Sequence, residues 1–208
     1  MIRKILKFCY INFIKIFFKK CYETRETQTP ILIRHIFRQR ILGINGGIYW
    51  PIHSSSIVTH PHNIFIGIDT SPGYMPGCYI QGNGKIYVGD YTQVASNVGI
   101  ISANHDVYDS RKHKNSVVSI GKYCWIGMNS VILPNVVLGD FTIVGAGSVV
   151  TKSFQEGYCV IGGNPARFIK KLDKTECNVF ENKYKYNGFI RNDKFTDFKD
   201  RKLNFKEL

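Results

Sequence analysis

The chain has 208 residues, 19 glycines, six cysteines and a formal net charge of +13. This length supports one core with appendages, and the composition excludes a disordered chain. The charge is +8 in residues 1–40, +1 in 41–167 and +4 in 168–208. A nearly neutral centre without a nucleic-acid-binding motif argues against a nucleic-acid partner. The scattered cysteines, with no CxxC pair, indicate buried thiols in a reducing cytosol.

The first predicted element is a basic amphipathic helical segment over residues 1–45. In MIRKILKFCYINFIKIFFKK, apolar residues recur near helical spacing, and basic residues interrupt them. The interruptions argue against a transmembrane span, and the lack of a small-residue cleavage site argues against a signal peptide. Two interpretations of residues 1–20 stay open: a helix on an anionic membrane surface, or one that packs on this protein or a partner subunit.

A six-residue repeat dominates the centre of the chain. From residue 120 the blocks read IGKYCW, IGMNSV, ILPNVV, LGDFTI, VGAGSV and VTKSFQ. An aliphatic residue leads each block, glycine often follows it, and the fifth position is small or modest in size. Blocks of the same kind begin at Val88, with weaker traces back to Ile66.

This period matches neither a helix nor a simple strand alternation. It suits short strands separated by corners, three to a coil, with the leading aliphatic side chains stacked inside. Glycine after the leading residue suits a corner where the backbone is tight or has a positive φ. The sequence therefore predicts an all-β solenoid over residues 46–165.

Two stretches carry a family resemblance: VGDYTQVASNVGIISANH, and VSIGKYCWIGMNSVILPNVVLGDFTIVGAGSVVTK followed by IGGNPARFIKKL. They resemble the hexapeptide-repeat acetyltransferases, in particular the maltose, galactoside and nodulation-type O-acetyltransferases, over roughly residues 80–172. The resemblance implies a left-handed parallel β-helix, a homotrimer with active sites between neighbouring subunits, and acetyl-CoA as co-substrate.

The same resemblance assigns individual residues. It implies His105 as the catalytic histidine and Asn83 where relatives hold an acceptor-binding carboxylate. It also implies five positions that bind acetyl-CoA, the last of them one helical turn beyond the fourth: Ala146, Thr151, Lys152, Arg167 and Lys170.

A histidine suits acetyl transfer because a hydroxyl needs a base, and the unperturbed pKa of imidazole is about 6.5. His105 would take the acceptor proton and return one to the CoA thiolate. A backbone carbonyl or a carboxylate such as Asp106 would orient its second nitrogen. Asn104 is either a turn residue or an acceptor contact. Trp125 either flanks the thioester arm or acceptor, or packs on a coil face or subunit interface.

Residues 106–119 break the repeat and are predicted to form an ejected loop. Two roles stay open for its histidine, His113: it takes part in acceptor selection, or it is only a surface residue. A zinc site needs three converging histidines. His60 and His62 precede the clear repeat and His113 lies in a flexible loop, so we predict no metal.

Residues 166–208 are predicted to form a short helix that caps the open end of the solenoid, followed by a basic tail. The favoured function is a cytoplasmic, acetyl-CoA-dependent O-acetyltransferase of a sugar hydroxyl in bacterial surface polysaccharide or glycolipid biosynthesis, at the inner face of the membrane if residues 1–20 bind it. The alternatives are an N-acetyltransferase of an amino sugar, a xenobiotic acetyltransferase, and a non-catalytic β-helical assembly subunit.

Overall fold

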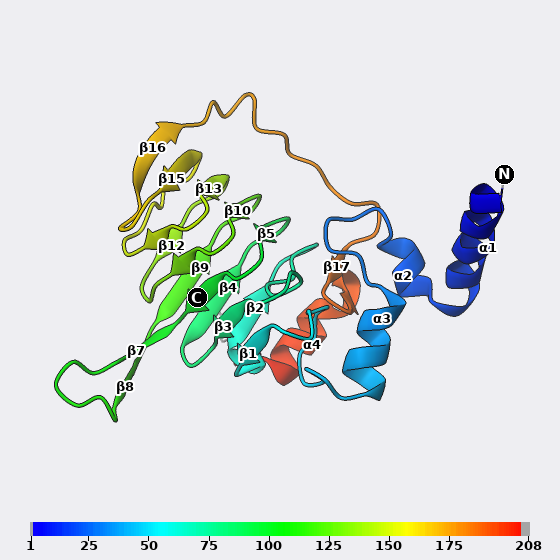
Figure 1. The fold of residues 1–208 in the computed structure, drawn as a ribbon, viewed down its shortest axis with the longest axis horizontal. Helices are drawn as coiled ribbons and strands as arrows, with labels where there is room; N and C mark the ends of the chain where they lie inside the picture. The colour runs from blue at the N-terminus through cyan, green and yellow to red at the C-terminus, as the bar shows by residue number, and fades with distance from the viewer. Residues whose placement is uncertain (1, 205–208) are drawn as a thin grey trace.

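The computed structural model describes residues 2–204. Met1 and residues 205–208, which belong to the predicted N-terminal segment and tail, lie outside this range. In chain order the molecule consists of N-terminal helices, a stack of parallel strands with a projecting hairpin, and a segment that runs back along the stack to the N-terminal end (Figure 1).

The stack is built from three sheets, here called A, B and C. Sheet A contains β1 (Ile57–Thr59), β3 (Tyr79–Gln81), β6 (Gly99–Ile101), β11 (Val131–Ile132) and β14 (Val149–Val150). Sheet B contains β2 (Ile64–Ile66), β4 (Lys85–Val88), β9 (Val117–Ile120) and β12 (Val137–Leu138). Sheet C contains β5 (Gln93–Val94), β10 (Trp125–Ile126), β13 (Thr142–Val144), β15 (Cys159–Gly162) and β16 (Arg167–Lys171).

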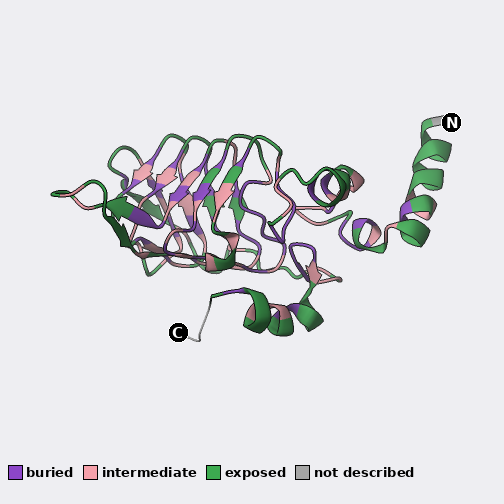
Figure 2. Ribbon diagram, turned by 90° about the horizontal axis from the view of Figure 1, so that it is seen from below, coloured by how far each residue is buried: buried purple, intermediate pink, exposed green. Residues whose placement is uncertain are grey.

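The chain visits the sheets in the order A, B, C, so each round forms one coil. Val131 pairs with Val149, and Trp125 with Ile143, in both cases 18 positions further on. The leading residues of the six blocks are at most 2% exposed: Ile120, Ile126, Ile132, Leu138, Val144 and Val150. Their burial confirms the predicted ladders of apolar side chains. Figure 2 shows buried segments, in purple, recurring along the stack.

Of the two alternatives expected for the glycine after the leading residue, the structure supports a tight backbone rather than a positive φ. Close approach requires the glycine at Gly121, Gly127 and Gly139. A Cβ on Gly121 would lie 2.6 Å from the backbone nitrogen of Asp140. Positive φ instead falls two residues later, at Tyr123 (54°) and Asn129 (59°). The corners at Gly121 and Gly127 thus combine a backbone contact that excludes side chains with one left-handed residue.

The corners define three edges of the stack, which we call the A–B, B–C and C–A edges after the sheets they join. On the B–C edge four left-handed residues are aromatic and stack in a ladder with centroids 4.9–5.1 Å apart: Tyr91, Tyr123, Phe141 and Tyr158. Phe180 of the returning segment packs on Tyr91 and Tyr123. The ladder therefore holds the returning segment along this edge.

The predicted helix at the end of the solenoid is wrong. Residues 167–171 form β16, which pairs antiparallel with β15. All five β16 residues are exposed, so the segment has the one-sided pairing of an edge strand rather than the buried face of a capping helix. The helix of the tail comes later, as α4 (Phe195–Lys202), after β17 (Tyr186–Asn187), β18 (Ile190–Arg191) and η3 (Asn192–Lys194). Its Phe195 packs on Phe65 of sheet B, 5.5 Å away.

The N-terminal segment is helical only in parts: α1 (Ile2–Phe17), α2 (Lys19–Glu23), α3 (Ile33–Ile36) and the π-helix η1 (Phe37–Ile41). A second apolar cluster joins it to the β17–β18 region through Ile14, Cys21, Ile31, Tyr186 and Phe189. Residues 46–56 contain no strand, so the first coil begins later than the predicted boundary. No helix within residues 2–204 has the length and apolar character needed to cross a membrane.

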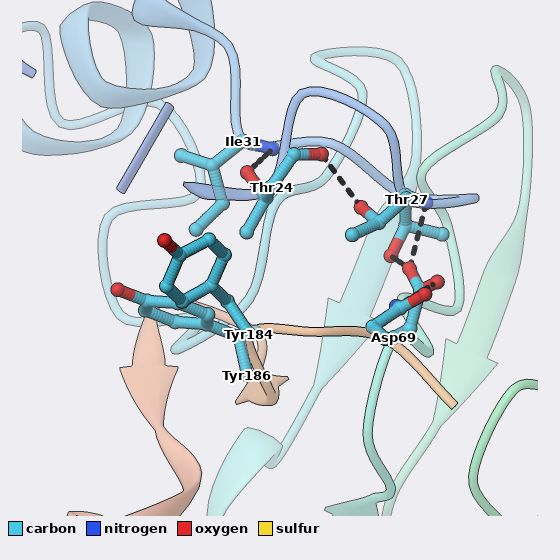
Figure 3. Close-up of a pocket in the computed structure, with 9 residues that line it drawn as sticks. Thr24, Thr27, Ile31, Asp69, Tyr184 and Tyr186 are labelled. Carbon is cyan, nitrogen blue, oxygen red and sulfur yellow. Dashed lines mark hydrogen bonds between the residues drawn. The ribbon is translucent and has the colours of Figure 1, made fainter. Parts of the chain in front are cut away.

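The buried carboxylate of Asp69 joins the N-terminal segment, the first coils and the returning segment. It accepts hydrogen bonds from the backbone nitrogens of Gln28 and Thr29, each at 2.9 Å, and from the amide of Asn182 at 2.7 Å. Figure 3 shows Asp69 and Thr27 on one side of the small pocket at this junction, with Tyr184 and Tyr186 on the other. These internal bonds give the site a structural role.

Candidate functional site

A β-hairpin leaves the stack at the A–B edge, between β6 and β9. Its strands are β7 (Ala103–His105) and β8 (His113–Asn115). The insertion is visible in the pairing, because Gly99 pairs with Val131, 32 positions on instead of 18. The predicted loop over 106–119 is thus an ordered hairpin in part, and residues 117–119 already belong to β9 of sheet B.

His105 ends β7, with an exposed side chain. Its Nδ1 hydrogen-bonds to the backbone carbonyl of Ser110, across the hairpin turn. A carbonyl oxygen can only accept, so Nδ1 carries the proton and Nε2 of the neutral ring carries the lone pair. This is the arrangement that a general base needs, with one nitrogen oriented and the other available to a substrate proton.

The structure therefore decides between the two orienting groups left open by the sequence. Asp106 bonds instead to the backbone nitrogen of Tyr108, at 2.8 Å, and pairs with Lys114 at 2.7 Å. The Lys114 ammonium and the backbone N–H groups hold the pKa of the Asp106 carboxyl below its usual range. Asp106 stabilises the hairpin that carries His105, rather than the imidazole itself.

The sequence reasoning missed the relation between His105 and His113. The two are register partners of β7 and β8, and their ring centroids lie 4.3 Å apart. His113 is therefore a fixed neighbour of the candidate base, not part of a flexible loop. In the sequence, His105 and His113 are equally many residues away from Asp109 at the hairpin turn, and this symmetry could have indicated that they pair.

Several predicted residues share the A–B edge with His105. Asn83 lies one coil earlier, between β3 and β4, with its side-chain oxygen 3.4 Å from the Thr59 hydroxyl. Thr151 and Lys152, both exposed, follow β14 at the same edge, two coils after the hairpin. Asn104 is exposed in β7 and pairs with Lys114, so it is a strand residue rather than a turn residue.

Other predicted residues lie elsewhere. Ala146 is exposed on the C–A edge, after β13. Arg167 is close to that edge, because Ala166 donates to the Val149 carbonyl at 2.8 Å. Lys170 pairs with Val160 further along sheet C, so it is not one helical turn from Arg167. Trp125, 56% exposed, stands on the outer face of sheet C.

One chain thus brings His105, Asn83, Thr151 and Lys152 to one edge, and Ala146 and Arg167 to another. The short strand β14 of sheet A separates Ala146 from Thr151. Between residues 2 and 204 no three His, Cys, Asp or Glu side chains are grouped as metal ligands would be.

Comparisons with known proteins agree with this architecture. The family described as "Bacterial transferase hexapeptide (six repeats)" matches residues 118–152. The galactoside O-acetyltransferase of Escherichia coli K12 is 28% identical over 172 residues, which cover 81% of this chain and 78% of that protein. A solved galactoside acetyltransferase in complex with coenzyme A superposes with a TM-score of 0.56 at 26% identity, over 67% of this chain and 70% of that one. The chain thus carries the hexapeptide repeat of bacterial transferases over residues 118–152, and over most of its length it is similar to galactoside O-acetyltransferases.

A further relative of this acetyltransferase is the putative lipopolysaccharide biosynthesis O-acetyl transferase WbbJ of E. coli K12. It is 36% identical over 102 residues, 43% of this chain. The matched part spans only 52% of WbbJ, about half its length.

Proposed function

We propose that this acetyltransferase transfers the acetyl group of acetyl-CoA to a sugar hydroxyl, with His105 as general base, from a left-handed parallel β-helix. The observation that carries the proposal is the hydrogen bond from His105 Nδ1 to the Ser110 carbonyl. It leaves Nε2 as the proton acceptor. Removal of the hydroxyl proton makes the acceptor oxygen a competent nucleophile toward the thioester carbon, and the same nitrogen then protonates the departing thiolate.

The exposed positions at the end of the stack suit acetyl-CoA. Lys152, Arg167 and Lys170 carry cationic side chains that can bind the phosphates of the cofactor, and Ala146 and Thr151 offer a small surface and a hydroxyl. The solved relative with coenzyme A bound supports this assignment. No metal has a part in the proposed chemistry.

The separation of the two edges supports a homotrimer. Sheet A lies between them, and its outward residues are largely apolar, with Ile57 58% and Tyr79 40% exposed. A three-fold ring with sheet A toward its axis would cover these side chains. It would also bring the A–B edge of one subunit, with His105, against the C–A edge of the next, with Ala146.

The acceptor is proposed to be a sugar of a surface polysaccharide or glycolipid. The galactoside and lipopolysaccharide relatives support a saccharide class. Asn83 bears an uncharged amide where the family holds a carboxylate, so the acceptor differs from a galactoside or maltose in its hydroxyl pattern. Asn104 and Trp125, both exposed, are candidate acceptor contacts. An amino-sugar or xenobiotic acceptor would use the same base, and the experiment distinguishes them.

The test is release of CoA from acetyl-CoA across sugars, nucleotide sugars, amino sugars and phenolic or alcoholic drugs. We expect a saccharide hydroxyl to support turnover, with kcat in His105→Ala lowered by about 10²–10⁴ and binding of acetyl-CoA retained. Turnover undiminished in His105→Ala would reject His105 as the base. Turnover with amino sugars or drugs alone would reject the O-acetyl assignment.

A further inference from the structure

The helix α1 has an apolar face that no part of the described chain covers. Residues three and four apart share a face of a helix. One row contains Leu6, Tyr10, Phe13 and Phe17, and the adjoining row contains Ile5, Cys9 and Ile16. Six of these side chains are 47–72% exposed: Ile5, Leu6, Tyr10, Phe13, Ile16 and Phe17. In Figure 2 the helix projects from the body and is exposed along most of its length.

The opposite face of α1 is cationic and holds the helix on the body. Arg3, Lys4, Lys7 and Lys15 lie there, and α1 contains no acidic residue. Ile14, in the same row as Arg3 and Lys7, is 2% exposed and belongs to the apolar cluster with Ile31 and Phe189. Because the helix is attached through this side, its apolar face points away from the protein.

A groove at the base of α1 is both apolar and cationic. It has a volume of about 370 Å³ and is lined by Phe17, Phe18, Ile36 and Phe189 together with Lys19, Lys20 and Arg40. No acidic side chain is among these lining residues. The pKa of Lys20 is lowered by its burial and then by the charges of Arg40 and Lys194, so cations are crowded here. Apolar walls with clustered cations suit an acyl chain below an anionic headgroup.

We propose that α1 and this groove bind an anionic lipid surface, with α1 lying in the plane of the interface. The apolar face would enter the acyl boundary, while the lysines and arginines would meet lipid phosphates. Charge complementarity favours lipid over a second copy of the chain, because a copy would bring two acid-free cationic helices together. The 16-residue α1 does not span the bilayer, so it lies on it.

The test is flotation of the full chain with vesicles of phosphatidylcholine alone and of phosphatidylcholine mixed with phosphatidylglycerol. We expect binding to the mixed vesicles, weakened in Ile16→Ser and weakened about tenfold or more in Leu6→Ser/Ile16→Ser. Phe8→Ser is the matched control. Phe8 is 69% exposed, as against 72% for Ile16, but shares the row of Lys4 and Lys15. Lys19→Gln/Lys20→Gln should reduce the preference for mixed vesicles, and free glycerol phosphate should not compete.

Three results would overturn the proposal. The first is no flotation of the full chain with mixed vesicles. The second is equal loss of binding in Phe8→Ser and Ile16→Ser. The third is that Leu6→Ser/Ile16→Ser floats as the wild type does but has a different molecular mass by light scattering. This result would identify α1 as a contact between copies of the chain. CoA release with a soluble acceptor should be the same in these variants, so the result is independent of the proposed function.

Discussion

The orientation of the His105 ring depends on contacts made entirely within the hairpin. The Ser110 carbonyl fixes Nδ1, and the His113 ring packs beside it. The hairpin in turn is held by the Asp106–Lys114 pair and by Asp109, which binds Arg111 at 2.9 Å. Backbone and side-chain groups of one short element therefore determine where Nε2 points, and substitutions there should act on kcat more than on stability.

The first prediction at this scale concerns His113. His113→Ser removes the ring that packs on His105, so the imidazole gains rotational freedom, and kcat should fall about tenfold. His113→Phe keeps an aromatic ring at the same register and should retain most of the activity. The measurement is steady-state kinetics with both substrates, with thermal unfolding as the folding control. Equal loss in both variants would mean that His113 acts through its nitrogens.

The second prediction concerns His35, which is 4% exposed and accepts a hydrogen bond from the Leu32 backbone at Nδ1. Burial, followed by the charges of Arg34, Arg38 and His53, lowers the pKa of His35 to about 4. As the pH falls, His35 is protonated in the unfolded chain before it is protonated in the folded chain, because its pKa in the unfolded chain is about 6.5. The stability that neutral His35 provides is therefore complete above pH 6.5 and is lost as the pH falls toward 4, by about 3 kcal/mol.

Urea unfolding at several pH values measures this dependence. His35→Gln removes the titrating group, so the free energy of unfolding should vary less between pH 6.5 and 4 than in the wild type. Comparison of the two proteins removes the contribution of groups that titrate alike in both. An unchanged slope in the variant would show that His35 is not protonated on unfolding in this range.

Of the features at the residue scale, the sequence could supply His105 but not its orientation. The Ser110 group is a backbone carbonyl, which leaves no mark in the side-chain pattern. Asp106 was an equally good candidate from the sequence, and only its pairing with Lys114 removes it. The His105–His113 contact depends on hairpin register, which a polar segment without alternation specifies weakly.

At the scale of elements, the coils were predictable because one physical constraint repeats. Every sixth side chain must enter a narrow interior, and Ile126 and Ile132 are fully buried as expected. The β16 segment was not predictable in this way. Its residues RFIKK are all exposed and pair on one side only, so no burial pattern distinguishes a strand from a helix there. Pairing with β15 decides the conformation.

The third prediction tests the close contact at the coil corners. In Gly121→Ala the added methyl group would meet backbone atoms of Gly139 and Asp140 at 2.6 Å, and backbone cannot yield as a flexible side chain can. We expect a loss of about 2 kcal/mol or more in the free energy of unfolding. Gly47→Ala is the control, since a methyl group there meets nothing within 4 Å. Comparable losses in both variants would reject the close-contact explanation.

At the scale of the whole molecule, one chain holds only part of the proposed site. His105 and Lys152 share the A–B edge, whereas Ala146 and Arg167 lie at the C–A edge beyond β14. The sequence repeat predicts the coils but carries no information on which edges meet in an assembly. The homotrimer is implied by the family resemblance, and burial of the apolar outer face of sheet A would give a physical reason for its assembly.

The fourth prediction follows from this division. His105→Ala inactivates the base, and Ala146→Trp places a bulky side chain where the cofactor is expected. Each protein alone should be inactive. If every site takes His105 from one subunit and Ala146 from the next, subunits of the two variants, unfolded and refolded together in equal amounts, should regain roughly a quarter of wild-type activity. This value follows because each site needs one intact edge from each of two randomly chosen neighbours. A site contained in one chain would regain nothing, because each chain carries one defect. Sedimentation of the refolded mixture as trimers is the control, and inactivity of such trimers would reject the shared site.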